Sequence, residues 1–188
     1  MLLLVAGLVM WSGLHFIPSL AISFRARQIE SLGNKMYRAV FSILIVISIV
    51  LMVFGWRSIE PVHIYSPPAW STAVTGLLVL VAFILFSAAH SKTIIRRIIR
   101  HPQLTGLFIW SIGHLLSNGD SRSLILFGTL GAWAIAEIFF INRREGEWVK
   151  PEPGSIKSEI LMLAKGVGMF VIFVVAHPYI AGVPVVAR

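Results

Sequence analysis

Residues 38–56 read RAVFSILIVISIVLMVFGW, and this stretch decides the fold class. After Arg38 it carries no charged residue, and its length is close to the roughly 20 residues with which an α-helix crosses the hydrocarbon core of a membrane. Similar runs lie on both sides of it. We predict an all-α fold, a polytopic helical bundle with six transmembrane helices at residues 2–24, 38–56, 70–90, 104–117, 124–141 and 160–180.

The composition agrees with a membrane protein and excludes a soluble enzyme. Apolar residues make up 57% of the 188 residues and charged residues only 13%, whereas soluble domains average about 45–50% and about 25%. A soluble domain of this size has too little interior to hide so much apolar surface. The chain contains no cysteine, which excludes disulfides, thiolate metal sites and cysteine nucleophiles. We expect a single domain, residues 1–188.

The positive charges predict the orientation. The chain has 16 Lys and Arg against 8 Asp and Glu, a formal charge of +8. In a membrane protein this charge belongs to the loops and does not indicate nucleic acid. Segments 21–38, 91–103 and 142–159 hold twelve of the sixteen, whereas the opposite side holds only Arg57, Arg122 and Arg188. Because positive loops stay in the cytoplasm, we predict that both termini lie outside.

Two histidines, His15 and His114, fall inside predicted spans, where ionisable residues usually mark function. Counted at 1.5 Å per residue from Arg25 and Arg100, their depths match to within about one helical turn. Two opposed imidazoles are too few ligands for zinc or a di-iron site, but they are sufficient as the axial pair of a haem. The alternative is a pair of histidines that form hydrogen bonds within the bundle and hold no cofactor.

Polar residues flank each of these histidines on its own helix, three positions before it and four after. They are Ser12 and Ser19 for the first, and Ser111 and Asn118 for the second. We expect them to hold the second ring nitrogen of each histidine, as residues behind a metal-bound histidine do. Glu137 is expected to snorkel, or alternatively to relay protons or pair with Lys165.

Arg100 and His101 precede Pro102 at an expected helix start. A helix N-terminus beside a cluster of arginines is suited to bind a phosphate, a carboxylate or a haem propionate. The alternative is an anchor for lipid headgroups. The remaining histidines, His63, His90 and His177, are expected at solvated or interfacial positions.

Small residues predict where helices pack. Gly128, Ala132 and Ala136 recur every four residues in the predicted fifth span, which favours close approach of another helix along this stripe. In the fourth span, Gly106, Gly113 and Ser117 are expected on one face together with Trp110.

The residues of interest also form a wider pattern. It comprises Trp11 to His15; Arg100, His101, Pro102, Gln103, Gly106, Trp110, His114, Asn118 and Gly119; Arg143 and Arg144; and His177, Pro178 and Gly182. In this pattern the chain resembles, over nearly its whole length, the NnrU family and its plant relative, 15-cis-ζ-carotene isomerase. The resemblance implies a multi-pass protein of the bacterial inner membrane in which His15 and His114 bind haem b, and which supports nitrite and nitric oxide reduction in denitrification.

The expected partners are membrane lipid, haem and either nitric oxide or a lipophilic substrate. One alternative function is haem-dependent cis–trans isomerisation of a carotenoid-like polyene, although the isomerase has a cysteine where this chain has Ser111. Another is a membrane methyltransferase that uses S-adenosylmethionine, because such enzymes also have an Arg-His-Pro helix start. Such enzymes also have a Glu-Glu pair followed by a Gly and Tyr pattern after the fifth span. Residues 145–147, Glu-Gly-Glu, only approximate that motif.

Overall fold

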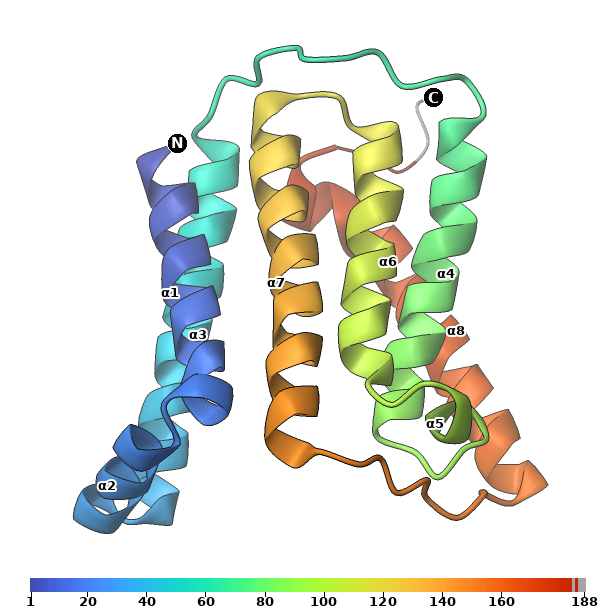
Figure 1. Cartoon of the computed structure of the whole chain (residues 1–188). Helices are drawn as coiled ribbons and strands as arrows, with labels where there is room; N and C mark the ends of the chain where they lie inside the picture. Colours follow the sequence, from blue (N-terminus) through green and yellow to red (C-terminus); the bar gives the residue numbers. More distant parts are fainter. Residues whose placement is uncertain (184, 186–188) are drawn as a thin grey trace.

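The computed structural model describes residues 1–183 and 185, and in this part of the chain the regular structure is all α-helical (Figure 1). The helices are α1 Leu2–Leu20, α2 Ile22–Leu32, α3 Asn34–Arg57, α4 Ser71–Ala89, α5 Ile95–Ile98, α6 Pro102–Ser117, α7 Ser121–Glu145 and α8 Ile156–Ala181.

Five of these helices, α1, α3, α4, α7 and α8, are long and apolar enough to cross a membrane. At most 33% of the residues in their most apolar windows are buried inside the protein. A soluble monomer does not leave so much contiguous apolar surface bare, so these faces contact lipid. The chain is therefore a multi-pass membrane protein.

Helix α6 corresponds to the predicted fourth span but differs from the other five. It has 16 residues, which corresponds to a length of about 24 Å, and it lies between α4 and α7 (Figure 1). Its polar backbone is shielded by protein on two sides. The structure thus supports five long apolar helices and one shorter helix packed among them. Pro102 lies in the first turn of α6, as predicted.

The predicted first span, 2–24, ends too late, because the helix is interrupted at Ala21. In a continuous helix the amide of Ile22 would donate to the carbonyl of Pro18. Arg144 of α7 donates to that oxygen instead, at 2.6 Å. The helix that follows, α2, has no buried residue and carries Arg25 and Arg27.

Both described ends of the chain lie at one end of the bundle, and the three basic segments lie at the other (Figure 1). The long connection between α3 and α4 crosses the end that holds the termini. The predicted grouping of the basic residues is therefore confirmed, except that Arg188 lies outside the described residues. The assignment of the basic end to the cytoplasm stays a prediction.

Helices α1 and α3 approach each other closely through glycines. A Cβ atom on Gly7 would lie 2.8 Å from the backbone nitrogen of Met52 and from the carbonyl oxygen of Ser48, and one on Gly55 would overlap the backbone of Leu4. On the other side of the bundle, Gly106 and Gly113 of α6 share a face, as predicted, and this face packs on α4. Trp110, expected on the same face, instead contacts Phe127 of α7.

The small-residue stripe predicted on α7 is not the face that packs. Gly128 has no neighbour within 4 Å of an added Cβ atom, and Ala132 is exposed. The buried face of α7 contains Phe127, Leu130, Gly131, Trp133, Ala134 and Glu137. This face contacts α1 on one side and α6 on the other, so α7 separates the two helices that carry the candidate histidines.

Candidate functional site

His15 lies in an aromatic enclosure between α1, α3 and α7. Its ring centroid is 4.1 Å from that of Trp11, 5.2 Å from that of Trp133 and 5.8 Å from that of Phe41. Its Nδ1 lies 2.9 Å from the carbonyl oxygen of Trp11, one turn earlier in the same helix.

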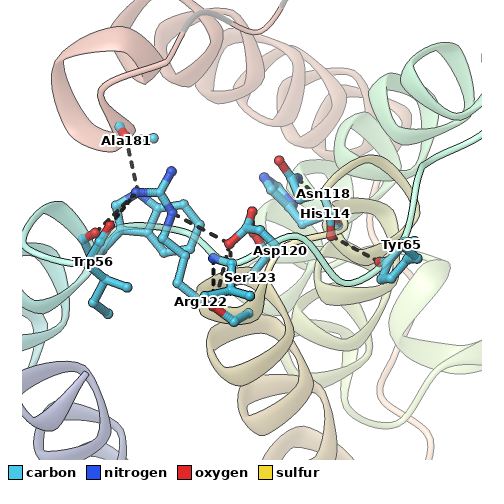
Figure 2. Close-up of polar contacts among 11 residues, drawn as sticks. Trp56, Tyr65, His114, Asn118, Asp120, Arg122, Ser123 and Ala181 are labelled. Atoms are coloured by element: carbon cyan, nitrogen blue, oxygen red, sulfur yellow. Dashed lines mark hydrogen bonds and ion pairs between the residues drawn. The ribbon is translucent and has the colours of Figure 1, made fainter.

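His114 has the same local arrangement on α6. Its ring is 4.4 Å from Trp110 and stacks on Phe127 of α7 at 4.4 Å. Its Nδ1 lies 2.9 Å from the carbonyl oxygen of Trp110. Figure 2 shows this histidine beside Asn118, at the end of α6 that also meets Tyr65.

These contacts fix the tautomer of both histidines. A carbonyl oxygen can only accept a hydrogen bond, so each Nδ1 must carry a proton. In the neutral imidazole, Nε2 then has a free lone pair, which is the form that binds a metal. A donor bond from the other ring nitrogen is the usual support of a metal-bound histidine. Here the backbone supplies it, so the expectation that nearby serine and asparagine side chains would do so is wrong.

A repeated sequence underlies this arrangement. Both helices contain Trp-Ser-x-x-His, at residues 11–15 and 110–114. The four-residue spacing stacks each histidine on its tryptophan and directs Nδ1 to the tryptophan's carbonyl. The sequence was interpreted as having no internal repeat, and this short one is the signal that was missed.

Several buried polar atoms around the two histidines have no partner in the structure. They are Trp11 Nε1, Ser12 Oγ, Ser111 Oγ and Trp133 Nε1. Three of these atoms lie on the His15 side of α7 and the fourth, Ser111 Oγ, lies on α6, so polar atoms able to form a hydrogen bond lie near both histidines. Ser111 is fully buried against Gly131 of α7.

The structure does not bring the two histidines together. His15 contacts Trp133 and His114 contacts Phe127, and six residues along α7 correspond to about 9 Å. The depths therefore differ by more than the single turn expected, since the count from Arg25 ran through the break at Ala21.

Glu137 is held by α1. Its Oε2 accepts a 2.9 Å hydrogen bond from the hydroxyl of Ser19, and its side chain is buried. It therefore does not snorkel, and the suggested pairing with Lys165 is wrong, because Lys165 lines a cavity on another side of the bundle.

Arg100 and His101 already have protein partners. Arg100 donates to the carbonyl of Gly146 at 2.7 Å and forms an ion pair with Glu145 at 3.3 Å. His101 Nε2 lies 2.8 Å from Asn142 Oδ1. These contacts clamp the start of α6 to the end of α7. Binding of an anion here stays a prediction, and it would have to compete with these contacts.

A cavity that sequence inspection missed lies next to His15. It has a volume of about 190 Å³ and is lined by Pro18, Arg25, Tyr37, Arg38, Phe41 and Ser42. The hydroxyl of Tyr37 is buried and has no partner. Phe41 lines this cavity and also contacts His15, so Arg25, Arg38 and Tyr37 lie on the far side of Phe41 from the histidine.

An ordered polar network lies at the other end of the bundle, where the termini lie (Figure 2). Arg122 lies 4.4 Å from the ring of Trp56, donates to its carbonyl at 3.3 Å and pairs with Asp120 at 3.6 Å. Trp56 Nε1 donates to the carbonyl of Ala181 at 3.2 Å. The network ties together α3, α7 and α8 above His114.

Tyr65 connects the outer loop to the end of α6. Its hydroxyl donates to the carbonyls of Leu115 and Asn118. Burial and the nearby Asp120 carboxylate raise the pKa of Tyr65 above its ordinary value. A phenolate cannot donate, so the loop is held to the end of α6 through Tyr65 only while this hydroxyl is protonated.

The described residues contain no group of three or more His, Asp or Glu side chains suited to hold a metal ion. His63 pairs through its backbone with Asp120, and His177 Nδ1 lies 2.7 Å from the carbonyl oxygen of Val183. Any metal bound at His15 or His114 must therefore bring most of its own ligands, as an iron porphyrin does.

Comparison with known families decides the classification. The family model described as NnrU protein matches residues 3–185. The chain belongs to the NnrU family. No curated protein and no solved structure matched the chain. The family match covers both Trp-Ser-x-x-His segments, the Arg100 helix start and His177, so the NnrU assignment applies to the whole site.

Proposed function

We propose that this NnrU protein binds haem b in the membrane, with His15 and His114 as axial ligands. The observation that carries the proposal is the repeated Trp-Ser-x-x-His arrangement, in which each Nδ1 is held by a carbonyl and each Nε2 is left free. The aromatic surroundings suit the porphyrin face, and a haem held by both histidines would supply one-electron chemistry. Nitric oxide could reach its iron only where one of the two histidines gave up its place.

The surroundings of His15 also suit the anionic edge of such a cofactor. Arg25, Arg38 and the unsatisfied hydroxyl of Tyr37 line the cavity beside Phe41. These groups can donate to a carboxylate without breaking an existing ion pair, because the ion pairs in the described residues involve Arg100, Arg122 and Arg144. In this respect they suit a propionate better than Arg100 does.

Joint ligation requires a rearrangement of the bundle. Each histidine now contacts a different aromatic side chain of α7, and one iron atom needs both Nε2 atoms within bonding distance. Phe127 and Trp133 would have to move from between the helices. The protein would hold His15 and His114 as neutral imidazoles and exclude water with its tryptophans, in a redox or nitric oxide linked role that supports denitrification in the bacterial inner membrane.

The test is an absorption spectrum of the detergent-purified protein, first oxidised and then reduced with dithionite. We expect the Soret and α bands of low-spin haem in the wild type. His15→Ala and His114→Ala should each abolish or shift the Soret band, whereas the matched control His63→Ala should leave it unchanged. A His15→Ala/His114→Ala double variant that retains a full complement of low-spin haem would refute the proposal.

The anionic edge is tested separately. An Arg25→Gln/Arg38→Gln variant should release haem more readily to apomyoglobin than the wild type does, and Arg27→Gln should behave as the wild type. Equal haem release from the two variants would exclude the cavity beside Phe41 as the propionate site.

A further inference from the structure

A cavity of the described part of the protein lies away from the two candidate histidines. It has a volume of about 540 Å³ and lies between α4, the start of α6 and α8. Its lining residues are Phe86, Ser87, His90, Ser91, Gln103, Lys165, Gly168, Met169 and Ile172. Known small-molecule sites have volumes of about 300–1,000 Å³ and combine apolar walls with a few convergent polar groups.

The charge that lines this cavity is positive, with no negative charge to balance it. Lys165 supplies a cation, His90 and Gln103 add polar atoms, and no carboxylate lines the cavity. Glu159, an acidic residue on the same helix, is occupied elsewhere, because its Oε1 accepts from the amide of Ile94 at 2.8 Å. Among the described residues, Lys165 takes part in no ion pair.

The depth of Lys165 makes this lack of a counter-charge informative. The residue lies nine positions after the start of α8 at Ile156, or about 14 Å along the helix. A lysine this far into an apolar helix is costly unless its ammonium reaches the interface or pairs with an anion. The walls beside it, formed by Phe86, Met169 and Ile172, are apolar.

We propose that this cavity binds an anionic amphiphile, with its carboxylate or phosphate head on Lys165 and its hydrocarbon chain along Phe86, Met169 and Ile172. His90 and Gln103, at the ends of α4 and α6 on the basic side of the bundle, donate to the head group. The site is separate from the candidate haem site, because its lining residues include neither His15 nor His114 nor the aromatic residues that stack on them.

Native mass spectrometry of the full chain in detergent tests the site. The probes are dioleoyl phosphatidylglycerol, the zwitterionic dioleoyl phosphatidylcholine and palmitate, each titrated separately. We expect at least one of the two anionic amphiphiles to bind about tenfold more tightly than phosphatidylcholine, and comparison of the two identifies the head group. Equal binding of all three probes would overturn the proposal.

Two variants localise the binding. Lys165→Gln should reduce anionic binding about tenfold, while Lys157→Gln, on the exposed first turn of the same helix, should not. Gly168→Leu should block the cavity without disturbing the fold, because no atom lies within 4 Å of a Cβ atom added at Gly168. Wild-type affinity in either Lys165→Gln or Gly168→Leu would refute the assignment.

Discussion

The packing of α1 against α3 can be tested at Gly7, which lies on the helix that positions His15. In a Gly7→Ala variant the new methyl group would lie 2.8 Å from the nitrogen of Met52 and the carbonyl oxygen of Ser48. Both are backbone atoms that cannot rotate away, so the two helices must separate. Gly13, on the same helix, is the matched control because an added Cβ atom there meets nothing within 4 Å.

The expected magnitude follows from two opposed contributions. Overpacking a close contact costs about 1–3 kcal/mol, and the immobile backbone neighbours favour the upper half of that range. Replacing a helical glycine by alanine stabilises the helix by about 1 kcal/mol, because alanine has the higher helix propensity. Gly7→Ala should therefore lower the free energy of unfolding by about 1–2 kcal/mol, given those two contributions. Gly13→Ala should be neutral or slightly stabilising.

The assay is thermal unfolding in detergent, followed by tryptophan fluorescence. For a chain of this size, about 1 kcal/mol corresponds to about 2–4 °C in Tm. We expect the Tm of Gly7→Ala to fall by several degrees and that of Gly13→Ala to remain within about 1 °C of the wild type or to rise, on the same scale. Equal Tm values for the two variants would show that the α1–α3 contact is looser than the structure indicates.

Three further predictions concern orientation, capping and pH. Because the chain has no cysteine, single cysteines can be labelled in intact cells with an impermeant reagent, and we expect labelling at position 63 and protection at position 97; the reverse pattern would invert the topology. Asp120 caps α7 by accepting from the amides of Arg122 and Ser123, so Asp120→Ala should lower stability in thermal unfolding by about 1–2 kcal/mol. Asp120→Asn should lower stability less, because its side-chain amide oxygen still accepts hydrogen bonds from the helix amides. Equal losses of stability in the two variants would assign the effect to the carboxylate charge. Because the pKa of Tyr65 is raised in the folded protein, its contribution to folding stability is complete below its ordinary pKa of 10.0. That contribution is lost as the pH rises through the pKa of the folded state. Tyr65→Phe should lower the Tm at neutral pH and flatten its alkaline decline, and an unchanged alkaline slope would contradict this assignment.

The local geometry of each histidine, although missed, could have been predicted from sequence, because it depends on spacing within a single helix. The four-residue interval between Trp11 and His15, and between Trp110 and His114, places each pair on one face. Pro102 marked the start of α6 for a similarly local reason. The contacts of Glu137 and Arg100 were not predictable, since their partners, Ser19 and Gly146, lie on other segments.

By itself the sequence determined the all-α membrane fold and the grouping of positive charge at one end, because hydropathy and charge govern how each segment meets the bilayer. Tertiary structure decided which face of each helix packs. Lipid is as apolar as a neighbouring helix, so hydropathy could not distinguish the lipid-facing stripe at Gly128 from the packed face at Gly131. Only the assembled bundle placed α7 between His15 and His114 and Lys165 in the wall of a cavity between α4 and α8.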